Sequence, residues 1–208
     1  MDAGAQLILN GPNAGNKALP RGADKTYNLT LYDSGIGGIG ATGAPTLSQG
    51  SYSLAGTGGT EIGAFSVSID VPGDLNWTNQ ASIPNPIPRG SNLPITWTGG
   101  GSGLVTIIGL ALAAVGGTTL DPIYNAVGFA CFSPASANSF TVPSSVLQQL
   151  PAVSGSFTGA QFGALAVFAV PDITRGQGAF SAPVIAGGST AQAFLEYQIG
   201  ALETIGYQ

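Results

Sequence analysis

Residues 33–40 read DSGIGGIG, and this stretch decides between two fold classes. Gly35, Gly37 and Gly40 match the spacing G-x-G-x-x-G, which binds dinucleotides where a strand turns through the glycines into a helix that holds the pyrophosphate. The stretch that follows, ATGAPTLSQG, contains two glycines and a proline where that helix would require good helix formers. We therefore interpret residues 33–40 as a glycine-rich loop between two strands, and we expect an all-β fold.

Short runs of β-branched and aromatic residues recur outward from this loop, between clusters of Gly, Pro, Asn and Ser. Such spacing is typical of a β-sandwich or barrel. One short helical turn is predicted at residues 143–150, because Pro143 suits the first helical position and Pro151 follows the segment. The predicted strands are residues 5–9, 25–31, 51–55, 63–71, 93–98, 105–111, 126–132, 139–142, 164–170 and 193–199.

A proline-rich segment suggests the domain boundary. Pro84, Pro86 and Pro88 alternate in a way that no central strand tolerates. We predict two sandwich domains in tandem: a small one over residues 1–74, a connector over 75–90 and a larger one over 91–208. One continuous sandwich stays open as an alternative, because the N-terminal part alone would be a marginal fold.

Charge is unusually sparse. Only 7% of the 208 residues are charged, the net charge is −5, and the five basic residues are dispersed, which excludes a patch for nucleic acid or an anionic membrane. The most apolar run, residues 103–117, is too short for a membrane span and is predicted to be a buried strand leading into an apolar loop. The chain begins without the features of a signal peptide, so a secreted or cell-surface protein would have had its leader removed or replaced.

The usual catalytic groups are missing. The chain has no histidine, so neither a serine triad nor the lone Cys131 has its common activating base, and we expect Cys131 to be a buried, inert thiol. No catalytic or cofactor-binding residue is predicted. An unfamiliar carboxylate-dependent hydrolase is a minor alternative, for which Glu196 is the first acid to inspect.

Calcium is the metal ion that the oxygen ligands in this sequence could bind. Zinc lacks its histidine and cysteine ligands, so no metal-binding residue is assigned. Structural calcium is an alternative reading of the loop aspartates, which otherwise serve as turn formers. The aspartates concerned are Asp70, Asp74, Asp121 and Asp172.

Aromatic residues are the weak candidates for ligand binding. Trp77, Tyr52 and Tyr124 could form a sugar-stacking platform of the kind that binding modules use. Trp97 alternates with Ile95 in a predicted strand and is expected in the core.

Several runs resemble the β-rich C-terminal region of large, uncharacterised, predicted secreted proteins from soil Acidobacteria. These runs are DAGAQLILNGPN at the start, residues 50–72, LNWTN at 75–79, LPITWTGG at 93–100 and SFTVPSSVLQQLPA at 139–152. The likeness as a whole, which includes the residues between these runs, covers about two-thirds of the chain. The resemblance implies an extracellular, immunoglobulin-like β-sandwich and supplies no catalytic residues. Residues 32–47, 111–125 and 159–177 depart from the pattern.

These observations favour a non-catalytic extracellular module with a structural or adhesive role. Its apolar stretches, residues 103–115 and 164–170, could leave a patch or strand edge that pairs with another copy. The partners considered are other copies of the chain and a surface polysaccharide. The alternative function is a carbohydrate-binding module that uses exposed aromatic residues.

Overall fold

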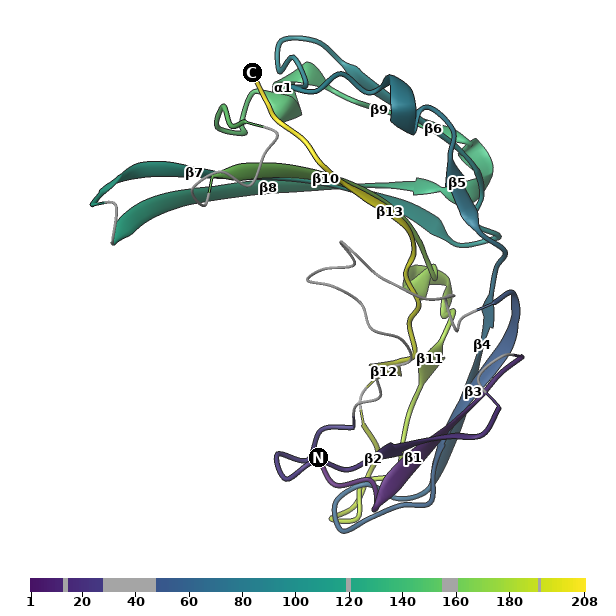
Figure 1. The fold of residues 1–208 in the computed structure, drawn as a ribbon. Helices are drawn as coiled ribbons and strands as arrows, with labels where there is room; N and C mark the ends of the chain where they lie inside the picture. Colours follow the sequence, from purple (N-terminus) through teal and green to yellow (C-terminus); the bar gives the residue numbers. More distant parts are fainter. Residues whose placement is uncertain (13–14, 28–47, 119–120, 155–160, 191) are drawn as a thin grey trace. The chain divides into compact units, whose positions relative to one another are not determined.

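The regular structure of the chain is mostly antiparallel β-sheet (Figure 1). The computed structural model describes residues 1–12, 15–27, 48–118, 121–154, 161–190 and 192–208. In these ranges the helical elements are α1 (Ser144–Leu147) and the 3-10 turns η2 (Gln80–Ser82), η3 (Ala135–Ala137) and η4 (Ile173–Arg175). The all-β expectation is confirmed, and α1 lies in the predicted helical turn. The loop at 33–40 and residues 28–31 of a predicted strand lie outside the described residues.

The chain divides into two compact units that differ from the expected domains. The first unit contains residues 1–74 and 171–197, and the second contains residues 75–170 and 198–208. The boundary at residue 74 is therefore also a boundary in the structure. Residues 75–90 belong to the second unit and are not a free connector, and residues 171–197 return to the first unit.

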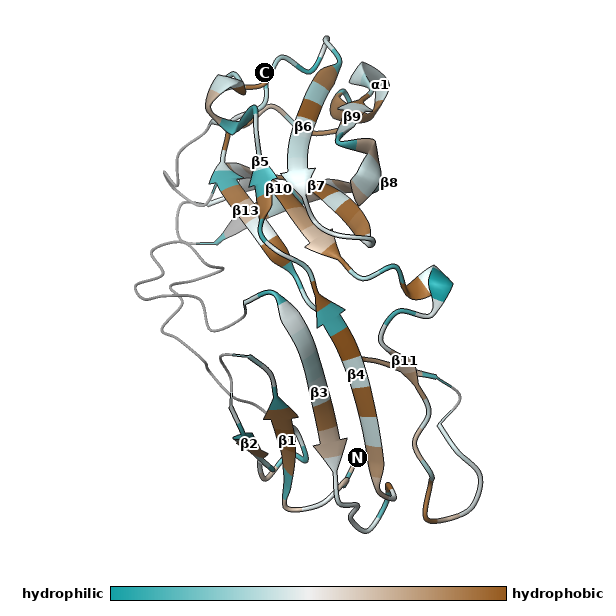
Figure 2. Ribbon diagram, turned by 90° about the vertical axis from the view of Figure 1, so that its right-hand side faces the viewer, coloured by the Kyte–Doolittle hydropathy of each residue, from teal (hydrophilic) through white to brown (hydrophobic). Residues whose placement is uncertain are grey.

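The first unit is built on a four-stranded antiparallel sheet in the order β2-β1-β3-β4. Its strands are β1 (Gln6–Asn10), β2 (Lys17–Pro20), β3 (Gly50–Gly56) and β4 (Phe65–Val71). On β4, buried Val67, Ile69 and Val71 alternate with exposed polar residues, a pattern that Figure 2 shows as colour bands along the strand. This alternation is what a strand with one buried face requires.

The returning segment completes the first unit's core. It contributes η4 and a short antiparallel pair, β11 (Ala179–Phe180) with β12 (Ala193–Phe194). The ring of Phe180 stacks on that of Phe65, with centroids 5.3 Å apart. Ile62 forms an isolated bridge with Val184. These contacts explain why residues 171–197 belong with the N-terminal sheet.

The second unit contains two sheets. The larger has the order β13-β10-β7-β8, with β7 (Leu104–Gly117), β8 (Pro122–Pro134), β10 (Phe162–Val170) and β13 (Ile199–Thr204). The smaller has the order β5-β6-β9, with β5 (Leu75–Trp77), β6 (Leu93–Gly99) and β9 (Ser139–Val142), and it lies across one face of the larger sheet (Figure 1). The unit is thus sandwich-like.

The space between these sheets is filled by large apolar side chains. Trp97 is buried, as expected, and its indole Nε1 donates a hydrogen bond of 2.8 Å to the carbonyl oxygen of Ala135. Ile87 is also buried, and its N–H donates to the carbonyl of Gly206 at 2.8 Å. The prolines near Ile87 therefore lie in a segment that the C-terminal residues bind by backbone hydrogen bonds. This is why the expected connector is part of the fold.

Candidate interaction surface

The three aromatic residues proposed from the sequence do not form a platform. Tyr52 is only 2% exposed and Trp77 only 5% exposed, so neither ring can stack on a ligand. Tyr52 lies in the first unit and covers the backbone of Gly11, whereas Trp77 lies opposite Trp97 in the second. Tyr124, on β8, is half-buried and alone keeps part of its ring accessible. The expectation of a shared site for Trp77, Tyr52 and Tyr124 was wrong.

The carboxylates suggested for calcium are likewise dispersed. Within the described ranges, no three Asp, Glu or Cys side chains gather closely enough to hold a metal ion. One oxygen of Asp172 accepts hydrogen bonds from the N–H and hydroxyl of Thr174 at 3.1 and 2.5 Å. Its other oxygen lies 3.3 Å from Nε of Arg175. Asp172 thus acts as the cap of η4, which is the turn-forming role that aspartate commonly has.

The first unit contains a cluster of charged side chains that was not predicted from the sequence. Asp2 is buried, and its carboxylate accepts hydrogen bonds from the N–H of Gly4, the hydroxyl of Thr60 and the guanidinium of Arg21. Hydrogen bonds from Gly4 and Thr60, together with Arg21, hold the pKa of Asp2 well below its usual range. A carboxylate held ionised this strongly is a poor proton acceptor.

The same cluster includes Glu61, whose carboxylate contacts a backbone N–H and an ammonium group. One oxygen accepts from the backbone N–H of Asp2 at 2.8 Å and the other pairs with the ammonium of Lys25. Lys25 is the main cause of the lowered pKa of Glu61. Because its acids are paired or capped, the cluster fixes the N-terminal residues to the 60–62 segment and offers no free acid or base for chemistry.

Two further residues were considered for catalysis from the sequence, Glu196 and Cys131. Glu196 is exposed and lies between β12 and β13, outside any strand. Cys131 is a free thiol on β8. It was expected to be fully buried, but it is only half-buried. Burial raises its pKa, which lowers the fraction of reactive thiolate at neutral pH.

The larger sheet of the second unit has a partly exposed apolar face, on which Thr106, Ala164 and Ala166 are buried. Val105, Ile107 and Ala111 of β7 are buried against the smaller sheet, whereas Ile108 and Leu110, which alternate with them, are exposed. We call this second side of the sheet the outer face. Strand pairing places on it Thr106, Ile108, Leu110, Leu112 and Ala114 of β7, Tyr124, Ala126, Gly128, Ala130 and Phe132 of β8, Phe162, Ala164, Ala166 and Phe168 of β10, and Gly200, Leu202 and Thr204 of β13.

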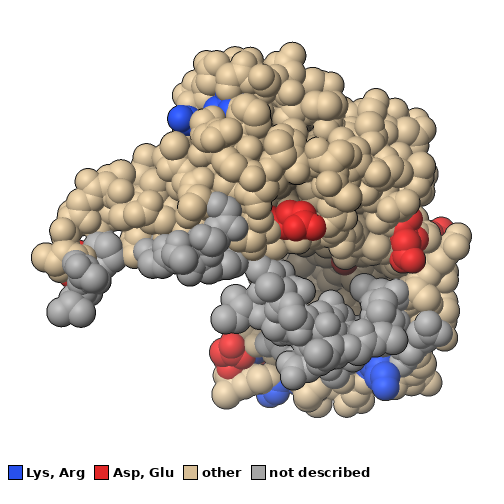
Figure 3. Space-filling model, turned by 45° about the horizontal axis from the view of Figure 1, so that its top comes forward, with Lys and Arg blue, Asp and Glu red and all other residues tan. Residues whose placement is uncertain are grey.

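The outer face carries no charge at any of these paired positions. Several large side chains on it are accessible, of which Phe132 is 60% exposed. Charged side chains are also few on the face of the molecule that Figure 3 displays. Exposed apolar patches are typical of surfaces that bind other proteins, membranes or ligands.

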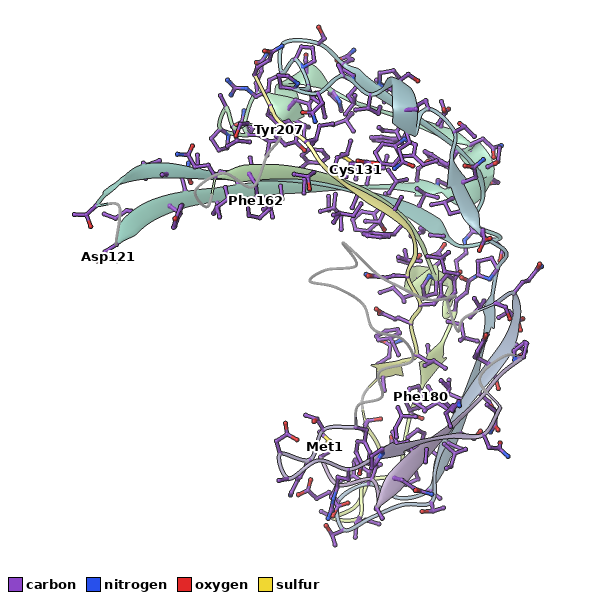
Figure 4. All side chains as sticks on the ribbon, in the orientation of Figure 1. Met1, Asp121, Cys131, Phe162, Phe180 and Tyr207 are labelled. Carbon is purple, nitrogen blue, oxygen red and sulfur yellow. The ribbon has the colours of Figure 1, made fainter. Side chains whose placement is uncertain are left out.

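The hairpin of β7 and β8 continues beyond the rest of its sheet. β10 pairs with β7 only as far as Leu112, whereas β7 pairs with β8 from Leu104 to Gly117. Asp121 lies at the far end of this hairpin in Figure 4. Near that end Val115 is 63% and Ile123 61% exposed. A two-stranded ribbon is marginal in water unless something packs on it, so this hairpin is suited to binding a partner.

The stretches expected to offer a strand edge are interior strands. All of residues 103–115 except Gly103 lie in β7, which pairs with β8 and β10. Residues 164–170 lie in β10, which pairs with β7 and β13. The edge strands are instead β13 and β8, and no strand among the described residues pairs with β8 on the side away from β7. The sequence showed the apolar character of this sheet but not its strand order.

The chain matches no model of a protein family, and no curated protein or solved structure was found to be similar to it. The described part of the chain contains no helix that is long and apolar enough to cross a membrane.

Proposed function

We propose that the protein is a non-catalytic structural or adhesive module of the cell exterior, built on an immunoglobulin-like sandwich. The observation that carries this proposal is the uncharged, partly exposed outer face with β8 as an edge strand of its sheet. Proteins bind extended surfaces through apolar patches and strand edges, whereas catalysis needs convergent acids, bases or nucleophiles in a concave site. No cofactor enters this proposal.

The paired state of the buried acids supports a non-catalytic role. Asp2 and Asp172 accept several hydrogen bonds each, and both contact an arginine. Glu203 accepts a hydrogen bond from the side-chain amide of Gln80. General acid or base catalysis needs a carboxyl whose proton can move near neutral pH, and these acids are committed to structural contacts.

Carbohydrate binding is the second candidate, and Tyr124 is the residue that favours it. Its ring is partly accessible on β8, and a tyrosine face can stack on a sugar. Trp77→Ala would not test this idea, because the Trp77 ring is buried and its loss would disrupt the second unit. Tyr124→Ser is the informative variant.

Bead adhesion tests the proposal. Beads coated with the protein are mixed with albumin-coated beads, with each other, and with insoluble polysaccharides and cell-envelope material. We expect protein-coated beads to cluster or to bind envelope material, and to lose this binding when Leu110→Ser and Phe132→Ser replace exposed apolar side chains. Binding to a polysaccharide alone, lost in Tyr124→Ser, would replace the proposal by the carbohydrate function. Absence of binding to every surface would contradict both.

A further inference from the structure

On one side of β8 the side chains are arranged symmetrically in size about its middle residue. The strand reads PIYNAVGFACFSP over Pro122–Pro134. Alternate positions counted outward from Gly128 are Ala126 and Ala130, then Tyr124 and Phe132, then the two terminal prolines. One side of the strand therefore carries the order large, small, glycine, small, large. When two copies of this strand pair in opposite directions about its middle, this order places similar side chains opposite each other.

β8 is also an edge strand that is open to such pairing. In an antiparallel ladder, alternate residues of an edge strand point their N–H and C=O groups away from the sheet. Among the described residues, only β7 pairs with β8. None of residues 123–132 is buried, so the strand is accessible along most of its length. The backbone of β8 thus offers an extended row of donors and acceptors.

Natural sheets usually protect such an edge with charge. A lysine or other charged side chain on an edge strand prevents pairing with another copy, and short or bulged strands have the same effect. β8 has 13 residues and no charged one, although the chain contains ten acidic and five basic residues. The nearest acid is Asp121, which precedes the strand. Nothing on β8 repels an identical strand.

We propose that β8 pairs antiparallel with β8 of a second copy about a two-fold axis that lies midway between the two Gly128 residues. Residues equally far from Gly128 then lie opposite each other, so Tyr124 faces Phe132 of the second copy and Ala126 faces Ala130. The two sheets join into one continuous sheet with a shared outer face. This inference names the partner of the interaction surface and so rests on the proposed function.

The side chains fit this register on both faces. Tyr124 and Phe132 form aromatic cross-strand pairs at the two ends of the outer face, and small residues meet at its centre. On the opposite face Val127 lies across from Phe129, which pairs an aliphatic with an aromatic side chain. The terminal prolines lack an N–H and end the ladder at matching positions. The two Asp121 carboxylates lie at opposite ends of the joined strands and do not meet.

Self-pairing explains this symmetry better than a different partner strand would. In a two-fold interface the same patch of both copies meets, so Tyr124 of each copy faces Phe132 of the other. An unrelated strand requires no symmetry in β8 and gives no reason for aromatic residues or prolines at equal distances from Gly128. The absence of charged residues from β8 also favours self-pairing, because the dimer would contain two copies of any charge on this strand.

A charge-reversal pair tests both the interface and its register. Ala126 and Ala130 are exposed, so changes there should leave the fold intact, which thermal unfolding verifies. In the proposed register A126K/A130K places lysine opposite lysine twice, and the dimer dissociation constant in sedimentation equilibrium should rise by about tenfold or more. A126K/A130E places lysine opposite glutamate twice, and its dissociation constant should return close to that of the parent.

Each remaining outcome overturns the inference. A parent protein that stays monomeric at every concentration contradicts the pairing, and bead adhesion in that case would leave the proposed function standing. A dimer that neither variant weakens has its interface elsewhere. Equal weakening by both variants contradicts the register about Gly128.

Disulfide trapping gives an independent measure of the register in a chain whose one native cysteine is removed by Cys131→Ser. Ala126→Cys and Ala130→Cys are made separately in that background. Opposite residues in an antiparallel pair have α-carbon distances compatible with a disulfide. We expect an equal mixture of the two variants to form a cross-linked dimer on oxidation, and each variant alone to form much less. Equal cross-linking of one variant alone and of the mixture would contradict the proposed axis.

Discussion

The aromatic ring of Phe129 lies over the backbone of Gly109 on the neighbouring strand. The two residues are direct partners in the pairing of β7 with β8, and a β-carbon added to Gly109 would fall among the ring atoms of Phe129. Glycine is therefore required at 109 to leave room for the ring. The relationship connects the interior of β7 to the edge strand that we propose as the interface.

Gly109→Ala is accordingly expected to destabilise the protein. The methyl group would displace the Phe129 ring, and overpacking of this kind costs about 1–3 kcal/mol in the free energy of unfolding. Urea denaturation measures the loss. Gly116→Ala on the same strand is the matched control, because the nearest atom to its new β-carbon is Cδ1 of Ile123 at 4.0 Å. A loss in the control as large as in Gly109→Ala would show that the ring contact is not the cause.

The stability of the first unit should depend on pH through Asp2. Its pKa is lower in the folded chain than in the unfolded chain, so its ionised form stabilises the fold above the unfolded value of about 4. That contribution should be lost as the pH falls from about 4 toward the folded pKa. Thermal unfolding across this range should show a steeper acid loss for the parent than for Asp2→Asn. Asp70→Asn, on the exposed side of β4, should retain the parent's slope; equal slopes for all three proteins would contradict the assignment.

Much of the fold follows from local patterns in the sequence. Residues 63–71 were predicted as a strand because apolar and polar residues alternate there. β4 spans Phe65–Val71, and the apolar residues of that alternation form its buried face. The segment at 139–142 coincides with β9. β7 was predicted too short, because its glycine-rich end reads as a loop, although pairing with β8 extends it to Gly117.

The features that could not be predicted from the sequence depend on contacts between residues far apart in the chain. The return of residues 171–197 to the first unit depends on contacts such as the stacking of Phe180 on Phe65, which join positions far apart in the chain. Tyr52 and Trp77 were considered as ligand-binding residues because local sequence does not reveal burial. The outer face was missed because residues of four strands form it, and strand order is needed to assemble them.

Tyr207→Phe should destabilise the second unit while leaving its packing unchanged. The hydroxyl of Tyr207 is buried and donates a hydrogen bond of 2.7 Å to the carbonyl oxygen of Ala164 on β10. Its removal leaves a buried acceptor without this donor, which costs about 1–3 kcal/mol. Urea denaturation measures the cost, and an unchanged near-ultraviolet spectrum of the tryptophans would show that the core is intact. Tyr124→Phe is the control, because that residue is only half-buried; an equal cost in both would argue against the hydrogen bond.

The thiol of Cys131 should react slowly with a disulfide reagent. Burial raises its pKa, so at neutral pH its thiolate fraction is lower than that of a small thiol with a pKa of about 8.5. The rate should rise with pH to a midpoint above that value and should increase sharply when urea unfolds the chain. In the proposed dimer Cys131 lies opposite Asn125 of the second copy, so the folded protein should also react more slowly at high protein concentration than at low. A rate that is independent of concentration while sedimentation shows a dimer would place the interface away from β8.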